Sequence, residues 1–325
     1  MKSILGIGNA LVDILAQLPN DDLLTAFNLP KGSMQHVDET TSNKIWETLR
    51  NNSSVKHVAG GSAANTLAGT AQLGLRSAYI GKTGNDEIGN LFAEDQSKQN
   101  VRHTLLKSAT ATGRCMVFIS PDTERTMATY LGAAIELVPE DLSAEMFEGY
   151  DYFHIEGYLV QNHALVQRAV ELAKDKGLII SLDLASYNVV EANKAFLLDI
   201  VKNYVDIVFA NETEAEVFTG KQPHEALIEL NKLSHIAIVK VGCNGSLVKC
   251  GEQIHTIDVF PANAIDATGA GDLYAAGFIY AHSLGLPLDK CGKAASLVAA
   301  KVVEVVGSHL DKELWATLRN TIATY

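Results

Sequence analysis

Residues 266–272 read Asp266-Ala267-Thr268-Gly269-Ala270-Gly271-Asp272 and run into the apolar segment Leu273-Tyr274-Ala275-Ala276-Gly277. Small residues at the start of a helix leave backbone N–H groups unpaired and let a phosphate approach closely. A carboxylate directly after such an anion site can take a proton from an attacking hydroxyl. The alternative is a glycine-rich turn with Asp272 in the first turn of a helix. The whole heptapeptide favours a phosphoryl-transfer site with Asp272 as its catalytic base.

A second glycine motif, Gly60-Gly61-Ser62-Ala63-Ala64-Asn65-Thr66, opens a segment rich in small residues. Paired glycines permit close packing against a ligand, and the Asn65 amide offers both a donor and an acceptor to a sugar hydroxyl. A helix that starts on a tight turn explains the motif equally well. It is not a Walker A phosphate loop, because no Gly-Lys-Ser/Thr follows.

A third motif, Gly6-Ile7-Gly8-Asn9, ends the first apolar run of the chain. A dinucleotide fingerprint would need a third glycine where Leu11 stands, and no helix clearly follows. We therefore interpret the motif as a strand end that presents Asn9 and Asp13 to a polyol.

Two later motifs each allow a structural and a functional interpretation. Asn211 and Glu214 follow an apolar run, so Asn211 can cap a helix, or the carboxylate can order Mg²⁺-bound water near ATP phosphates. Lys240 precedes a turn that contains Gly242 and Gly245. That segment is either a hairpin turn or a wall for an adenine nucleotide.

Short apolar runs alternate with longer helix-period segments, which predicts an α/β fold with a mainly parallel sheet covered on both faces. The expected strands are 3–7, 77–80, 151–155, 178–182, 206–209 and 236–241. The expected helices are 61–73, 86–99, 162–176, 191–204, 212–219, 224–233, 268–284, 288–303 and 312–322. Segments 13–37 and 112–132 look like β insertions with turn signals, and they predict a small lid.

Composition excludes several classes of protein. The 325 residues are 47% hydrophobic and carry a net charge of −12, which argues against binding to nucleic-acid backbones. The four cysteines have no C-x-x-C spacing and the histidines form no H-x-H or H-E-x-x-H pattern, so we expect reduced thiols and no zinc site. The start reads as a strand rather than a signal peptide, and no apolar run reaches membrane length. We therefore expect a soluble, cytoplasmic protein without a membrane partner.

Taken together, these motifs resemble those of the ribokinase-like (PfkB) family of sugar and nucleoside kinases, from Gly6 to Gly307. The resemblance implies a single domain over residues 1–325, a three-layer α/β/α sandwich with a small β lid. It implies phosphoryl transfer from ATP and Mg²⁺ to a primary hydroxymethyl group, with Asp272 as base and the N–H groups of Gly269, Ala270 and Gly271 as the anion hole. Asn211 and Glu214 match the motif that supports Mg²⁺ through water. The matches to substrate contacts are Asp13, Gly61 and Asn65, with Asn9, Gly60 and Glu156 beside them.

The resemblance also implies a monovalent-cation site, such as a K⁺ site, beside the anion hole. Its ligands here would be the Asp266 carboxylate and backbone carbonyls near Thr268, Val302, Val305 and Gly307.

Within the family, residues 204–215 and 112–134 are most similar to adenosine kinases, and Arg125 matches an arginine that neutralises the transferring phosphate. A solvated lid residue is the alternative for Arg125. Glu156 is typical of ribokinases instead, where it bonds a sugar, or it caps the next segment. Few lid aromatics can stack on a purine: Phe27, Phe118 and Tyr130 are the candidates.

Several alternatives therefore stay open. The substrate is an adenosine-like nucleoside or a sugar, as in ribokinases, fructokinases or 2-keto-3-deoxygluconate kinases. A non-catalytic sugar or nucleoside sensor is the rival from another class. A monomer and a homodimer formed through the lid are both compatible with the sequence.

Overall fold

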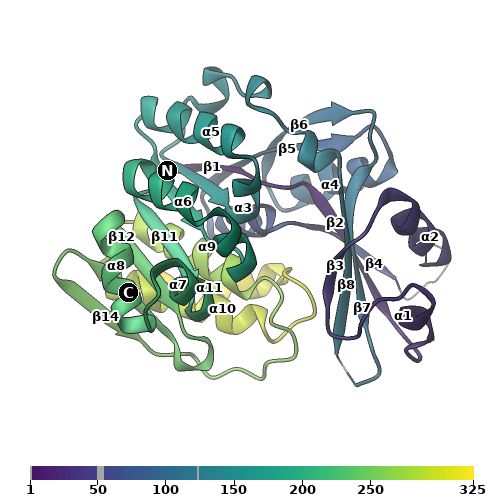
Figure 1. Cartoon of the computed structure of the whole chain (residues 1–325). Helices are drawn as coiled ribbons and strands as arrows, with labels where there is room; N and C mark the ends of the chain where they lie inside the picture. Colours follow the sequence, from purple (N-terminus) through teal and green to yellow (C-terminus); the bar gives the residue numbers. More distant parts are fainter. Residues whose placement is uncertain (1, 50–54, 123) are drawn as a thin grey trace.

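A nine-stranded sheet crosses the body of the computed structural model, which describes residues 2–49, 55–122 and 124–325 (Figure 1). The strand order is β14 (Gln253–Ile257), β13 (Ser246–Cys250), β12 (Ile236–Lys240), β11 (Ile207–Asn211), β10 (Ile179–Asp183), β9 (Tyr152–Glu156), β1 (Ser3–Ile7), β5 (Arg76–Gly84) and β6 (Arg102–Ser108). Pairing is parallel from β12 to β6 and antiparallel only through β13 and β14 among these strands. The mainly parallel sheet is confirmed, although β6, β13 and β14 were not among the expected strands.

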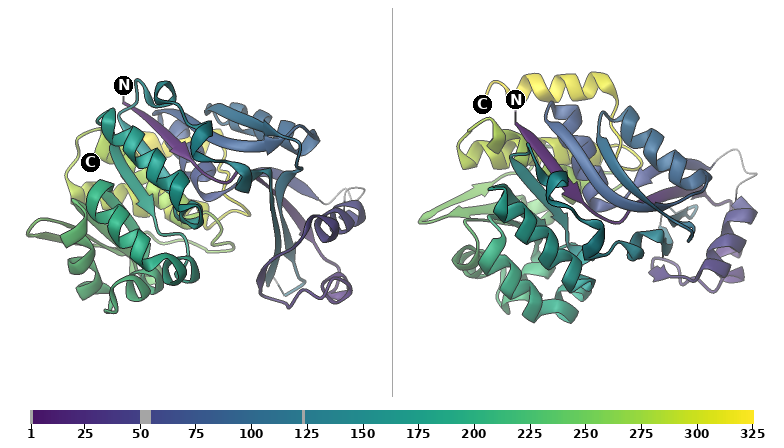
Figure 2. Two further views of the ribbon diagram at one scale, coloured as in Figure 1. Left: turned by 45° about the horizontal axis from the view of Figure 1, so that its top comes forward. Right: turned by 90° about the horizontal axis from the view of Figure 1, so that it is seen from above.

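Helices cover both faces of this sheet, as the view from above shows (Figure 2). One face carries α3 (Ser62–Leu73), α9 (Ala270–Ser283), α10 (Leu288–Val302) and α11 (Lys312–Ile322). The other carries α5 (His163–Asp175), α6 (Tyr187–Tyr204), α7 (Glu212–Thr219) and α8 (Pro223–Leu233). Strand side chains alternate between the two cores: Ile207 and Phe209 of β11 join the first, and Val208 and Ala210 the second. The expected three-layer sandwich is confirmed.

A second, five-stranded sheet projects from the body and forms the lid (Figure 1). Its order is β3 (Met34–His36), β8 (Arg125–Gly132), β7 (Thr112–Ile119), β2 (Leu11–Gln17) and β4 (Lys56–Gly60). The expected hairpin in segment 112–132 is confirmed, since β7 and β8 pair antiparallel; residue 123 lies outside the described residues.

The first lid segment differs from the expectation. Besides β2 and β3 it contains a helix, α1 (Asp22–Ala26), and the lid continues into α2 (Glu39–Leu49) and β4. Apolar side chains of α1 and α2 pack on the outer face of the lid sheet; they include Leu24, Ile45 and Leu49. These side chains form the lid part of the first core, called the lid core below, and they are continuous with the apolar side chains of α3 and α9.

The helix α4 (Glu87–Lys98) lies where lid and body meet. Its Asp95 carboxylate accepts a hydrogen bond from the Ala59 N–H of β4 at 2.9 Å. All four cysteines are free thiols; Cys115 and Cys291 are buried, whereas Cys250 is half-buried and Cys243 is exposed. Within the described ranges, no helix combines the length and apolarity needed to cross a membrane.

Candidate active site

The carboxyl edge of the main sheet is lined with polar residues. The adjacent parallel strands β9, β10, β11 and β12 end in Glu156, Asp183, Asn211 and Lys240. Open parallel sheets bind ligands at this edge. Three of these residues were candidates from the sequence, whereas Asp183 was not, because an aspartate after a buried strand carries no motif of its own.

Asp272 lies at this edge in the first turn of α9, whose N-cap Gly269 adopts a left-handed φ of +75°. Its carboxylate accepts hydrogen bonds from Ser62 Oγ at 2.7 Å and Asn65 Nδ2 at 2.9 Å. Ser308 Oγ in turn donates to Asn65 Oδ1 at 2.8 Å. The two glycine motifs, about two hundred residues apart in the chain, therefore converge on one carboxylate.

The charge state of Asp272 suits a base. Burial raises the pKa of this carboxyl to about 6, while the hydrogen bonds from Asn65 and Ser62 oppose the rise. At neutral pH the group is mostly ionised yet basic enough to accept a proton, which is the balance that general-base catalysis needs.

The loop of residues 266–272, called the signature loop from here on, is tightly turned. The Ala270 N–H donates to the Ala267 carbonyl at 3.2 Å, so one of the three amides expected in the anion hole is engaged within the loop. A methyl group on Gly269 would come within 2.8 Å of Ser308 Cβ, and one on Gly271 within 3.1 Å of Lys240 Nζ.

Glu156 joins two loops rather than capping the segment that follows it. Its Oε1 accepts from the Asn9 N–H at 2.9 Å and from Asn9 Nδ2 at 2.7 Å, and its Oε2 accepts from the Ala63 N–H at 3.0 Å. The residue is 1% exposed, and burial raises its pKa to about 7. Glu156 therefore positions Asn9 and the start of α3. It also lines the cavity described below.

The Asp13 carboxylate packs directly against Gly60, and the Asn9 carbonyl packs against Gly61. A methyl group on Gly60 would lie 2.2 Å from Asp13 Oδ1, and one on Gly61, whose φ is +93°, would lie 2.5 Å from the Asn9 carbonyl oxygen. Side chains larger than hydrogen are excluded at both positions. Burial, followed by the nearby Asp272 charge, raises the pKa of Asp13 to about 7.

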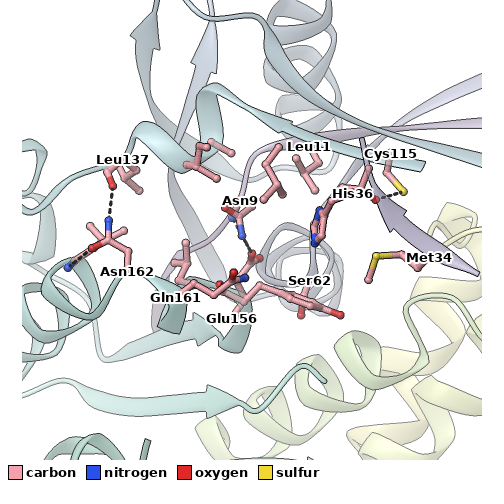
Figure 3. A pocket seen from close by; sticks show the side chains of 18 of the residues that line it. Asn9, Leu11, Met34, His36, Ser62, Cys115, Leu137, Glu156, Gln161 and Asn162 are labelled. Carbon is pink, nitrogen blue, oxygen red and sulfur yellow. Dashed lines mark hydrogen bonds between the residues drawn. The ribbon is translucent and has the colours of Figure 1, made fainter. Parts of the chain in front are cut away.

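A cavity of about 670 Å³ opens between the lid and the body; we call it the acceptor pocket. Its polar end is formed by Asn9, Asp13, Gly61, Ser62 and Glu156. Its remaining wall is largely apolar and includes Leu11, Met34, Cys115, Met127, Leu131, Leu137 and Tyr158. Figure 3 shows Met34, His36 and Cys115 of the lid on one side, and Gln161 and Asn162 on the other.

The aromatic candidates for purine stacking lie elsewhere. Phe118 is fully buried in the lid core and Phe27 packs against that core, while the Tyr130 ring lies 5.9 Å from the Arg114 guanidinium. Tyr158 is the aromatic residue that lines the pocket. Sequence reasoning missed it because it stands in a short 3₁₀ turn, Gly157–Gln161, after β9.

Arg125 reaches from the lid to the signature loop. Its Nη2 lies 2.6 Å from Asp266 Oδ2, and its Nη1 donates to Thr268 Oγ1. Asp266 also accepts from the Thr268 N–H at 2.8 Å and from the Gly307 N–H at 2.6 Å. The Val302 carbonyl accepts from the Val305 N–H at 3.1 Å. Two of the expected monovalent-cation ligands, the Asp266 carboxylate and the Val302 carbonyl, are therefore hydrogen-bonded, and a guanidinium stands at the carboxylate. The cation site stays a prediction.

Asn211 and Glu214 form a reciprocal cap at the start of α7. The Glu214 N–H donates to Asn211 Oδ1 at 2.8 Å, and Glu214 accepts from the Asn211 N–H and Nδ2 at 2.7 and 2.6 Å. Burial, then the Asp183 charge, raises the pKa of Glu214 to about 7. In the part of the chain that the structure describes, no three acidic, histidine or cysteine side chains converge on a metal position. Both Glu214 carboxylate oxygens are engaged in this cap, and the water-mediated contact of Glu214 with Mg²⁺ stays a prediction.

The turn after β12 contains the two glycines expected to border a nucleotide. Gly242 and Gly245 have φ values of +55° and +89°, and the Val241 N–H donates to the Gly245 carbonyl at 2.8 Å. The segment is a hairpin, since β12 and β13 pair antiparallel, and its role as a wall for a nucleotide stays a prediction. Lys240 Nζ points away from that turn and lies 2.8 Å from Asp183 Oδ2.

Comparison with known proteins agrees with this geometry. The model of the pfkB family of carbohydrate kinases matches residues 32–314. A probable sugar kinase from Rhizobium etli is 32% identical, with a TM-score of 0.88 and 98% of both chains covered. An adenosine kinase from Sinorhizobium meliloti is also 32% identical, with a TM-score of 0.87, covering 98% of this chain and 99% of that one. A nucleoside kinase from Methanothermobacter thermautotrophicus is 27% identical over 89% of this chain and 92% of its own length.

The family match covers most of the chain, and the two glycine motifs meet at one buried carboxylate. These findings together assign the chain to a family. The chain belongs to the PfkB family of carbohydrate kinases and is an ATP-dependent kinase of the class that acts on sugars and nucleosides.

Proposed function

We propose that this kinase transfers the γ-phosphoryl group of ATP to the primary hydroxymethyl group of a nucleoside of the adenosine type. The convergence of Ser62 and Asn65 on Asp272 carries the proposal, because Ser62 also lines the polar end of the acceptor pocket. In this position Asp272 accepts the hydroxyl proton while the oxygen attacks phosphorus.

The lining of the pocket favours a nucleoside over a free sugar. A free sugar carries hydroxyls on most of its edge, and each one buried without a partner costs free energy. Most of the lining outside the polar end is apolar and includes Met34, Met127 and Leu131, although His36, Thr129, Gln161, Asn162 and His163 also contribute to it. A ribose at the polar end with a flat base against thioether and leucine side chains satisfies both regions, since methionine makes favourable contacts with aromatic rings.

The chain's own residues divide the remaining tasks. Asn9, Asp13 and Glu156 orient the ribose hydroxyls directly or through each other, and the lid excludes water. The free N–H groups of the signature loop and Arg125 meet the charge that develops on the phosphoryl oxygens. When bound, Mg²⁺ supplies further neutralisation of the phosphates. The proposal assigns no step to a monovalent cation, because Arg125 already neutralises Asp266.

The decisive experiment measures ADP release with adenosine, inosine, cytidine, ribose, fructose and 2-keto-3-deoxygluconate as acceptors. We expect turnover with adenosine or a related nucleoside, and a loss of about 10³-fold or more in kcat for Asp272→Asn. Asp289→Asn, in the first turn of α10, is the matched control and should retain activity.

Two outcomes would contradict the proposal. Turnover of free sugars alone would replace the nucleoside with a sugar as the substrate. Near-normal turnover by Asp272→Asn would remove Asp272 as the base.

A further inference from the structure

An ion pair that the proposed chemistry does not yet use connects the ends of β10 and β12. Lys240 Nζ lies 2.8 Å from Asp183 Oδ2, and the two side chains are 16% and 7% exposed. Because β11 lies between β10 and β12, the pair passes over the end of a strand, next to the signature loop. A charge pair this well buried at a ligand-binding edge calls for an explanation.

Asp183 is held rigidly. Its Oδ1 accepts a hydrogen bond from the Ala185 N–H at 3.0 Å. Ala185 has a φ of +67°, a left-handed conformation that is costly for a residue with a side chain and that persists only where the surroundings enforce it. A methyl group on Gly157 would come within 2.4 Å of the Asp183 carbonyl oxygen. Backbone strain and close packing thus fix the carboxylate in one place.

Lys240 is directed toward the place where phosphoryl charge develops. Its Nζ would lie 3.1 Å from a methyl group on Gly271, so the ammonium stands over the signature loop. Burial disfavours the charged ammonium, but the charges of Asp183, Glu214 and Asp272 outweigh it and raise the pKa of Lys240. The ammonium is therefore charged at neutral pH.

We propose that Lys240 is a catalytic residue that neutralises the phosphoryl group in transfer, and that Asp183 is the positioning residue that holds Lys240 over the signature loop. The P–O bond to the β-phosphate oxygen of ATP breaks as the bond to the acceptor oxygen forms. The acceptor proton passes to Asp272, ADP leaves, and Lys240 keeps its own proton throughout. This inference rests on the proposed kinase chemistry and adds the Lys240 ammonium to the groups that neutralise the phosphoryl charge.

The competing explanation is that the pair only ties β10 to β12. Under that explanation, removing the charge lowers stability and leaves the chemistry intact. A lysine that contacts the transferring group instead affects the transition state more than the bound substrates, as is known for donors aimed at developing charge.

The first test is Lys240→Met, which keeps most of the side-chain length and removes the charge. With ATP and the best acceptor from the panel, we expect kcat to fall by about 10²-fold or more while the acceptor KM changes less than about threefold. The acid limb of the pH profile should also move to higher pH, because Lys240 opposes the rise in the Asp272 pKa. Lys240→Arg should recover part of the activity.

A second readout does not depend on turnover. Calorimetric titration compares ADP alone with ADP plus aluminium fluoride, a planar mimic of the phosphoryl group, both in the presence of the acceptor. Lys240→Met should weaken the second complex at least about tenfold more than the first, because the mimic carries the charge that Lys240 meets. Asp183→Asn should show the same pattern with a smaller loss, and the double variant should lose no more than Lys240→Met.

The control is Lys249→Met on the neighbouring strand β13, whose ammonium contacts the Gly251 carbonyl; its kinetics should match those of the wild type. The inference is overturned if Lys240→Met keeps kcat within threefold and leaves both the acid limb and the fluoride complex unchanged. If the Asp272→Asn variant instead keeps wild-type turnover, the proposed kinase chemistry itself is overturned. The two failures are therefore distinguishable.

Discussion

At the scale of single residues, the site depends on a chain of polar contacts that ends at Asp272. Ser308 orients the Asn65 amide, and Asn65 and Ser62 then donate to the two carboxylate oxygens. Each donor favours the ionised form, whereas burial favours the neutral acid. The donors therefore set the pH above which Asp272 can act as a base.

Ser62→Ala should shift the pH dependence of catalysis. Loss of one donor raises the pKa of Asp272, so the acid limb of kcat/KM should move upward from about pH 6 by roughly one unit. Activity at pH 8.5 should stay within about threefold of the wild type. Ser283→Ala, at the last residue of α9, is the control. An equal loss of activity at every pH would show that Ser62 positions the substrate instead.

Asp13→Asn should stabilise the protein while harming activity. The folded-state pKa of Asp13 is raised from 3.8 to about 7, so its stabilising contribution is complete below pH 4 and is lost as the pH rises through 7. Above that pH the protein holds a buried charge that asparagine does not carry. In calorimetry the Tm should rise by a few degrees at pH 8 and by less at pH 5.

Asp175→Asn at the exposed end of α5 is the control for that experiment, and its effect on Tm should be the same at both pH values. A Tm gain for Asp13→Asn that does not change with pH would contradict the raised pKa.

At the scale of elements, strong local signals made most of the body predictable. Segments 3–7, 212–219 and 312–322 were predicted with the bounds of β1, α7 and α11, because apolar periodicity, caps and glycines coincide there. The short helix α1, the edge strands β6 and β14, and β13 next to β14 were missed. They are brief, half-exposed elements, so their burial patterns are weak and packing against the rest of the fold determines them.

The site residues also divide into those that local sequence signals reveal and those that only the tertiary fold brings into place. Asp272, Asn65 and Asn9 could be found from the sequence, because glycines with a steric function mark their loops. Asp183, Ser308 and Tyr158 could not be found, because only the register of β9 to β12 and the path of the last loop bring them to the site. The partners of Arg125 and Lys240 likewise become visible only in three dimensions.

The start of α9 can be tested with two glycines that share a φ of +75°, Gly269 and Gly285. Alanine at either position should cost about 1 kcal/mol of stability for the left-handed conformation. At Gly285 the added methyl group meets nothing within 4 Å, whereas at Gly269 it meets Ser308 Cβ at 2.8 Å. Gly269→Ala should therefore also displace the Ser308–Asn65 contact and lower kcat at least tenfold, while Gly285→Ala keeps its activity.

Comparable activity in the two variants at a temperature where both are folded would contradict this account of the signature loop. Urea unfolding curves recorded alongside the kinetics separate the two effects, since a shared loss of stability with unequal kcat is the expected result.

At the scale of the whole molecule, the lid and the body are separate sheets joined near α4 and again at the lid tip. The second connection is the ion pair of Arg125 with Asp266, in which the carboxylate side chain is 1% exposed. Removing one partner of a buried pair leaves an uncompensated charge, which is more costly than losing a surface pair. The pair thus ties the lid to the signature loop, with a guanidinium that phosphate can also engage.

Arg125→Ala should release the lid in the ligand-free protein. We expect a larger radius of gyration by small-angle X-ray scattering and faster proteolysis within the lid, because the connection at the lid tip is lost. Arg125→Lys should be intermediate, since one ammonium cannot reproduce both contacts with Asp266 and Thr268. Arg168→Ala, at an exposed arginine on α5 of the body, is the matched control and should scatter like the wild type. Unchanged scattering and proteolysis of Arg125→Ala would mean that the joint at α4 alone holds the lid in place, and Arg125 would then act only on the phosphoryl group.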